Sequence, residues 1–393
     1  MALRPFPPAS LRLTRLPLPP RPRPWPRPMC QAPVRRFHLN PVFMPPLYFV
    51  GLLAALWVWK CTMMVVFQNK IIYTPGLPPN ARRETIADYE SQCYGIRWRE
   101  ERIRAADNTK LALCVAEVRA GADRELLPEA STGARRIPVY ILYFQGNASS
   151  IPPRLPDLSS VLRVLRDHDK SAEYAYTMVC LSYRGYWTSS GRASERGINK
   201  DAEAALRWIA DRSEQELEQC SVPPVLIFWG QSVGSGFATN LAVSRNFPST
   251  LRLDSIILET PFLSIKEMLG AVYPGKWIPY RYLWPFLRNH LDSWKNMGTL
   301  AERSSAAKVP PPRIFILEAG RDELVPPSHA ESIYGRCVEV SLPVEKAVVH
   351  NAYHNEAMIR AEGKRAVTRA IETHVAEALR RRQEVSSGDD GSA

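Results

Sequence analysis

Six short runs of mostly apolar residues limit most strongly what this sequence can fold into. Each run is five to eight residues long, and polar or helix-forming segments separate one run from the next. Continuous apolar runs of this length are typical of strands buried on both faces of a parallel sheet, and their alternation with helices indicates an α/β architecture. The runs are residues 137–144, 177–183, 225–229, 255–259, 313–318 and 345–349.

An alternating pair of segments precedes these runs and predicts how the sheet begins. Arg97–Ala105 and Lys110–Val118 are joined by Asp107-Asn108, which favours a hairpin-like start. Helical patterns are expected later, at residues 155–168, 201–211, 235–245 and 355–382. The predicted body, residues 84–382, is therefore α/β, with a mostly parallel central sheet flanked by helices.

One long interruption breaks the strand–helix alternation. Between Phe262 and Pro312 no strand pattern occurs for about 50 residues, and the segment is rich in Tyr and Trp. Long connections of this kind often act as lids over a site. We expect residues 263–311 to form a helical cap or lid insertion; a helical excursion packed on the edge of the sheet is the alternative.

The chemistry is indicated by Gly230-Gln231-Ser232-Val233-Gly234, which matches G-x-S-x-G. The pattern alone is common, but here a buried strand enters it and a helix leaves it, as a nucleophile elbow requires. Such a turn exposes the serine hydroxyl at the carboxyl edge of the sheet, and the flanking glycines leave room for it. Ser232 is therefore the candidate nucleophile.

A serine nucleophile needs a base and an orienting acid, which in this setting follow the serine in the order acid, then histidine. Asp322 follows the run 313–318, with Glu323 beside it as the competing acid. His354 lies in the loop after the last run, whereas His350 comes directly at the end of that run, next after residue 349. We predict Asp322 and His354, because each lies in a loop at the carboxyl end of a strand.

The developing oxyanion needs two main-chain donors. The amide of Val233, next after the nucleophile, is one candidate. The other is Asn147, in the loop after the run 137–144. Asn147-Ala-Ser also matches a glycosylation sequon, but a glycan there would block the site, so we discount it.

The charge of the chain belongs to its N-terminal part. The formal net charge is +12, no acidic residue occurs before Glu84, and the first 83 residues sum to +12. The body is thus electrically balanced, which argues against a nucleic-acid partner despite the basic pI. The seven cysteines are scattered without paired spacing, which predicts neither a disulfide framework nor a metal site.

The N-terminal part divides into a leader and an apolar segment. Residues 1–46 are rich in Pro and Arg, and we expect them to be disordered. Residues 47–67 are long and apolar enough for a single membrane anchor, with Lys60 as the one charge; an uncleaved targeting sequence and a buried helix packed on the body are the alternatives. The Arg-rich leader fits either the endoplasmic reticulum or the mitochondrion. At the other end, we expect a disordered tail at residues 383–393.

These motifs together resemble the α/β-hydrolase superfamily, specifically the membrane-anchored serine hydrolases of its bud-emergence-associated branch, with the fungal members most similar. The resemblance covers roughly residues 47–380. It rests on the segments 70–75, 145–148, 182–186, 191–197, 230–236, 259–262, 322–327 and 354–355. One departure is Gln145, which stands where the family has His before Gly-Asn-Ala.

The resemblance implies an α/β-hydrolase fold and a serine hydrolase acting on acyl esters or thioesters, with Ser232, Asp322 and His354 as the triad. Animal relatives include lysophospholipid lipases and enzymes that remove palmitate from proteins, so a lipid, another acyl-containing small molecule or an acylated protein is the expected partner, at a membrane. The mechanism needs no cofactor or metal. A peptidase or amidase on the same fold, and a catalytically silent scaffold, are the alternatives.

Overall fold

The computed structural model describes residues 41–120, 136–220 and 222–389. The chain divides into two compact units, Met1–Leu56 and Trp57–Ala393. The described part of the first unit holds a short 3-10 helix, Pro41–Phe43, and the start of helix α1 (Met44–Val66). Most of the predicted leader, residues 1–40, lies outside the described residues.

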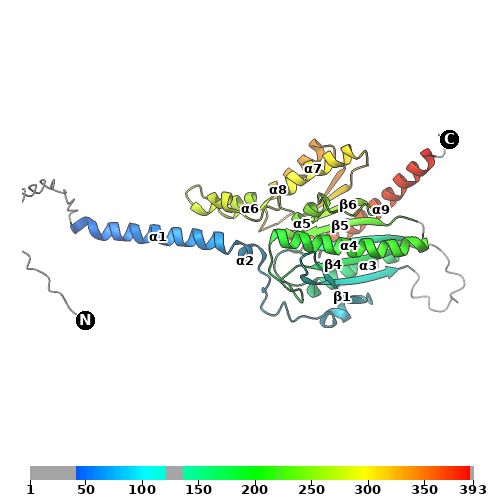
Figure 1. Cartoon of the computed structure of the whole chain (residues 1–393), viewed down its shortest axis with the longest axis horizontal. Helices are drawn as coiled ribbons and strands as arrows, with labels where there is room; N and C mark the ends of the chain where they lie inside the picture. The colour runs from blue at the N-terminus through cyan, green and yellow to red at the C-terminus, as the bar shows by residue number, and fades with distance from the viewer. Residues whose placement is uncertain (1–40, 121–135, 221, 390–393) are drawn as a thin grey trace, which may run out of the picture. The chain divides into compact units, whose positions relative to one another are not determined.

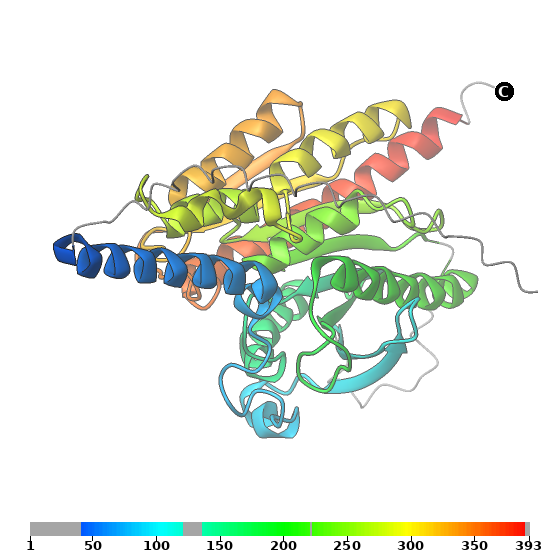
Figure 2. The ribbon, with the colours of Figure 1, turned by 60° about the vertical axis from the view of Figure 1, so that its left-hand side comes forward.

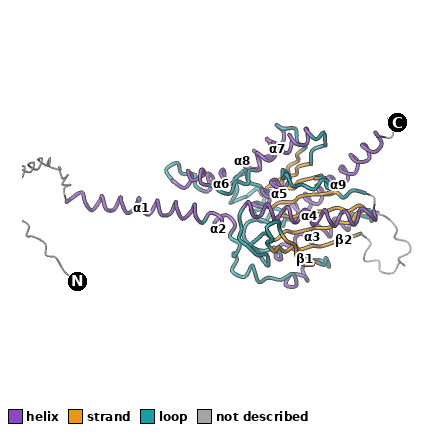
Figure 3. The backbone as a smooth tube through the Cα atoms, in the orientation of Figure 1, coloured by secondary structure: helices purple, strands orange, loops and turns teal. Residues whose placement is uncertain are grey.

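The second unit is built on one eight-stranded sheet, whose strands run in the order β1-β2-β4-β3-β5-β6-β7-β8. The first three strands of this order pair antiparallel and the rest pair parallel. Figure 1 draws the strands as arrows, and Figure 3 shows them in orange with helices around them. This arrangement confirms the predicted α/β class and the hairpin-like start. The strands are β1 Trp98–Arg104, β2 Lys110–Arg119, β3 Ile137–Phe144, β4 Tyr174–Ser182, β5 Val225–Gln231, β6 Leu253–Glu259, β7 Arg313–Ala319 and β8 Val344–Val349.

Helices cover both faces of this sheet, which is why its central strands read as continuous apolar runs. Every residue of β5 and β6 is buried. One face packs against α4 (Glu195–Cys220), α5 (Val233–Ala242) and α8 (Pro327–Glu339), and α7 (Ser293–Ala306) packs on α5 and α8. The other packs against α3 (Leu155–His168) and α9 (Ala361–Asp389).

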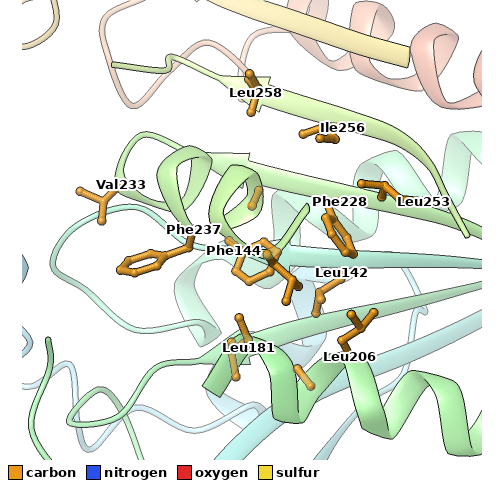
Figure 4. Close-up of a cluster of buried hydrophobic side chains, with 14 of the residues drawn as sticks. Leu142, Phe144, Leu181, Leu206, Phe228, Val233, Phe237, Leu253, Ile256 and Leu258 are labelled. Carbon is orange, nitrogen blue, oxygen red and sulfur yellow. The ribbon is translucent and has the colours of Figure 1, made fainter. Parts of the chain in front are cut away.

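The core beside the nucleophile strand is aromatic. Phe144 of β3 and Phe228 of β5 meet edge to face, with ring centroids 6.1 Å apart, and Phe237 of α5 lies in the same buried cluster (Figure 4). Edge-to-face pairs of this kind are stabilising beyond the area that they bury. The strand that leads to Ser232 is therefore held rigidly by its neighbours.

The long interruption divides into two parts. Helix α6 (Ile265–Val272) and the 3-10 segment η5 (Pro279–Phe286) pack against each other, whereas α7 packs on α5 and α8. The whole segment lacks strands, as expected, and its second part, α7, packs on helices of the body. The cap consists of residues 265–287, which hold α6 and η5.

Both ends of the last helix differ from the sequence prediction. Helix α9 begins at Ala361 instead of residue 355, and it continues to Asp389. The predicted disordered tail is thus wrong for residues 383–389, while residues 390–393 lie outside the described part. Nε of Arg380 lies 3.8 Å from Oε1 of Glu384, one turn further along the helix. An ion pair at this spacing favours continuation of the helix.

Helix α1 contains all of the predicted apolar segment except its last residue, Phe67. Among the described residues, Pro41–Val66 is the one helical stretch long and apolar enough to cross a membrane, with a mean hydropathy of 1.9. A short helix, α2 (Gln68–Tyr73), follows it. The end of α1, residues 57–66, and α2 lie beside the cap. Figure 2 shows this end of α1, in blue, next to α6, in yellow-green.

Candidate active site

Ser232 occupies a strained turn between β5 and α5. Its φ is +50° and its ψ is −114°, a conformation that costs free energy for any residue with a Cβ. A Cβ at Gly230 would lie 2.6 Å from Cα of Ser235, and one at Gly234 would lie 2.1 Å from the carbonyl oxygen of Phe144. Both glycines are therefore required by close backbone approach, as the G-x-S-x-G pattern predicts.

His354 and Asp322 join Ser232 in one hydrogen-bonded chain. Nε2 of His354 lies 2.9 Å from Oγ of Ser232, and Nδ1 lies 2.7 Å from Oδ2 of Asp322. The acceptor carboxylate favours the tautomer with hydrogen on Nδ1, which leaves Nε2 free to accept the serine proton. His354 is only 3% exposed, so the hydrogen bonds are shielded from water.

The loop 322–325 fixes the orientation of the acid. Oδ1 of Asp322 accepts hydrogen bonds from the amides of Leu324, at 2.9 Å, and Val325, at 2.7 Å. Glu323, the competing acid, does not take the imidazole: its Oε2 accepts the main-chain amide of His354 at 3.0 Å. Adjacent carboxylates therefore hold the side chain and the backbone of the same histidine.

His350 lies elsewhere. It follows the last residue of β8 and is exposed. Its Cα would lie 2.6 Å from a Cβ placed on Gly320, so the backbone there packs tightly against the end of β7. The structure brings His354, and not His350, to Ser232.

Val233 and Asn147 lie on the same cavity as Ser232. Val233 is the first residue of α5, where a helix amide has no partner within the helix. Oδ1 of Asn147 accepts hydrogen bonds from Ala148 N, at 2.7 Å, and from Oγ1 of Thr74, at 3.0 Å. The Asn147 side chain thus shapes the loop, and its main-chain amide remains our candidate for the second oxyanion donor.

Gln145 is buried next to this loop. Its main-chain carbonyl accepts the hydroxyl of Tyr183 at 2.8 Å. Neither polar atom of its side-chain amide has a hydrogen-bond partner among the described residues. With Gln145 at the position of the family's His, the hydrogen bond that holds this loop is therefore made by the main-chain carbonyl and not by the side chain.

Glu259 is a residue of the site that the sequence analysis missed. It ends β6 beside Gln231, its carbonyl accepts the Ser232 amide at 2.8 Å, and its carboxylate accepts the Trp229 indole at 3.1 Å. Burial raises the pKa of this carboxyl, against the nearby Arg154. The available signal was an acidic residue ending an apolar strand next to the nucleophile strand.

A cavity of about 520 Å³ opens beside Ser232 and His354, within the range of ligand pockets. Its other walls are mostly apolar and come from the cap, from α1 and α2, and from the loops after β3, β6 and β7. Within residues 41–389, gaps at 121–135 and 221 excepted, no cluster of three or more His, Cys, Asp or Glu is arranged to hold a metal ion.

A Ser–His–Asp chain at the carboxyl edge of a mostly parallel eight-stranded sheet defines the α/β-hydrolase fold. The solved α/β hydrolase from Vibrio vulnificus superposes with a TM-score of 0.52 at 15% identity, over 79% of this chain and 92% of that one. Solved structures thus share the fold. No family model matches the chain.

The resemblance to the membrane-anchored α/β-hydrolase-domain proteins is confirmed by curated relatives. Alpha/beta hydrolase domain-containing protein WAV2 of Arabidopsis thaliana is 28% identical, over 70% of this chain and 77% of the relative. Protein bem46 of Schizosaccharomyces pombe is 25% identical, over 69% and 75%. Lysophosphatidylserine lipase ABHD12 of Danio rerio is 33% identical, over 49% of this chain and 46% of that relative. These relatives support the interpretation that this chain is a hydrolase.

Proposed function

We propose that this protein is a membrane-anchored serine hydrolase that cleaves acyl esters or thioesters through an acyl-enzyme intermediate. The observation that carries the proposal is the hydrogen-bonded chain from Ser232 through His354 to Asp322, which faces an apolar cavity. The curated relatives, among them a lipase, support it.

The geometry suits general-base catalysis followed by acyl transfer. Nε2 of His354 takes the proton of Ser232 as Oγ attacks the acyl carbonyl, and Asp322 stabilises the imidazolium that forms. The amides of Val233 and Asn147 stabilise the oxyanion. His354 then gives its proton to the leaving alcohol or thiol, and a water activated by the same imidazole releases the acyl group from Ser232.

The cavity favours a substrate with a hydrocarbon chain. Its lining is mostly apolar, and burying a chain there is favourable by about 0.8 kcal/mol per methylene. The lipase name of ABHD12 supports a lipid substrate, although the match spans less than half of that relative. We propose a lipid or an acylated protein as substrate, with α1 anchoring the enzyme in the endoplasmic reticulum or mitochondrial membrane.

The test is hydrolysis by the full-length protein in detergent. p-Nitrophenyl esters from acetate to palmitate, an S-palmitoyl thioester and an aminoacyl amide are compared. We expect ester and thioester hydrolysis with little amide hydrolysis, and loss of about a thousandfold or more in Ser232→Ala. Equal activity in Ser232→Ala would refute the proposal, and a preference for the amide would favour the peptidase alternative.

A further inference from the structure

The end of the apolar helix is part of the active-site cavity. Five residues from the last turn of α1 and from α2 line the same cavity as Ser232: Met64, Val65, Gln68, Ile71 and Ile72. Apolar side chains of the cap, including Met268 and Leu283, line it too. A helix that served only as an anchor would have no need to approach the catalytic serine.

Gln68 ties this helix end to residues 286–288, where the cap ends. Its side chain is 5% exposed. Its Nε2 donates to the carbonyl of Phe286 at 3.1 Å, and its Oε1 accepts the main-chain amide of Arg288 at 2.7 Å. Because both ends of a buried amide are satisfied by the same segment, the position of Gln68 is strongly determined.

Arg288 caps the end of α1. Its guanidinium donates to the carbonyl oxygens of Val65 and Val66, both at 2.9 Å. These last carbonyls of a helix lack partners within it and carry the negative end of the helix dipole. The charge-assisted bonds therefore hold the end of α1 beside the cavity.

Two further contacts hold α2 and α1 in place. The hydroxyl of Tyr73, which is fully buried, donates to Oδ1 of Asn289 at 2.9 Å, and its ring packs on Phe237 of α5, with centroids 6.1 Å apart. In α1, Nζ of Lys60 lies 5.1 Å from the ring centroid of Tyr280 in the cap, a favourable cation–π distance. The one charge of the apolar segment thus faces the cap.

We infer that residues Met64–Ile72 form a wall of the acyl-binding pocket and determine the length of acyl chain that the enzyme accepts. The inference rests on the proposed acyl-ester function. The ligand is the hydrocarbon chain itself, held between the end of α1, α2 and the cap, with its carbonyl at Ser232. Specificity then depends on the segment that also anchors the protein.

The first test narrows this wall in the full-length protein. Met64→Trp adds bulk inside the cavity, and Thr62→Trp, on an exposed residue of the same helix that does not line the cavity, is the matched control. We expect the ratio of kcat/KM for palmitoyl over butyryl p-nitrophenyl ester to fall at least tenfold in Met64→Trp and to keep its wild-type value in Thr62→Trp. If Met64→Trp lowers the thermal midpoint of unfolding, Ile71→Trp is used for the same test. An unchanged ratio in folded wall variants, or an equal fall in the control, overturns the inference.

The second test does not depend on catalysis. A palmitic acid that carries a diazirine is photolysed with full-length Ser232→Ala protein in detergent, and the modified peptides are mapped. We expect saturable labelling of Met64–Ile72, competed by unlabelled palmitate and reduced in Met64→Trp. Labelling that does not saturate, or none in this segment, overturns the inference. Saturable labelling without ester hydrolysis by the wild type keeps the inference and refutes the proposed function alone.

Discussion

Glu323 accepts the main-chain amide of His354 at 3.0 Å, while the neighbouring Asp322 bonds the imidazole of the same histidine at 2.7 Å. Two adjacent carboxylates in one loop therefore have separate tasks. Asp322 sets the tautomer and the direction of the ring, and Glu323 sets the position of the backbone that carries it.

The two carboxylates are expected to respond differently to isosteric substitution. Asp322→Asn should lower kcat on p-nitrophenyl butyrate by about three to four orders of magnitude, because the amide favours the wrong tautomer of His354. Glu323→Gln keeps an acceptor for the His354 amide and should lower kcat less than about tenfold. Equal losses in the two variants would show that the division of tasks is wrong.

The two histidines of the last loop offer a matched pair. His354→Ala removes the group that lies 2.9 Å from Oγ of Ser232, and we expect a loss of kcat of at least about a thousandfold. His350 is exposed and lies outside the site, so His350→Ala should stay within about twofold of the wild type. A large loss in His350→Ala would mean that the base has been misassigned.

The elbow glycine is expected to be indispensable for stability. Gly234→Ala would place its Cβ 2.1 Å from the Phe144 carbonyl oxygen, and the backbone would have to move, at a cost of about 3 kcal/mol or more. Gly335, inside α8, has nothing within 4 Å of its ideal Cβ. Gly335→Ala should raise the free energy of unfolding by about 0.5–1 kcal/mol. Guanidinium unfolding in detergent measures both, and a neutral Gly234→Ala would contradict the elbow geometry.

A buried histidine is expected to make the fold sensitive to acid. Nδ1 of His374 in α9 lies 2.6 Å from Oγ of Ser255 in β6, and burial, with the nearby Arg313, lowers its pKa from 6.5 to about 4. Between pH 6.5 and pH 4, His374 binds a proton in the unfolded chain but not in the folded chain. The free energy of unfolding therefore falls by about 1.4 kcal/mol per pH unit as the pH is lowered to 4.

The comparison of His374→Asn with the wild type isolates this contribution. Between pH 6.5 and 4 the free energy of unfolding of the wild type should fall by up to about 3 kcal/mol more than that of the variant. Denaturant unfolding at a series of pH values gives both curves. Parallel curves would show that His374 does not titrate in this window.

Strong local signals made much of the fold and the site predictable. Helix α3 has the bounds that its apolar spacing predicts, residues 155–168. Ser232, Asp322 and His354 could be named because each follows a strand, and parallel strands end at one edge of the sheet. The structure brings these three side chains together, and their catalytic roles remain our proposal.

Contacts between distant parts of the chain could not be predicted in this way. Gln68 and Arg288 are 220 positions apart, and the sequence around each residue gives no sign that the two are in contact. Helix α4 begins at Glu195 instead of residue 201. The carboxylate of Glu195 accepts a hydrogen bond from Nδ2 of Asn240 at 3.0 Å, a contact with a distant part of the chain. The hydrogen bond of Glu323 and the burial of Glu259 likewise depend on tertiary packing, which a single sequence does not display.

Covalent labelling of the full-length protein with a fluorophosphonate probe, followed by mass spectrometry of the modified peptide, tests whether Ser232 is the nucleophile. We expect one adduct on Ser232 in the wild type, no adduct in Ser232→Ala, and labelling slowed by at least about a hundredfold in His354→Ala. Equal labelling of the wild type and Ser232→Ala, or no labelling of a folded wild type, would show that Ser232 is not the nucleophile.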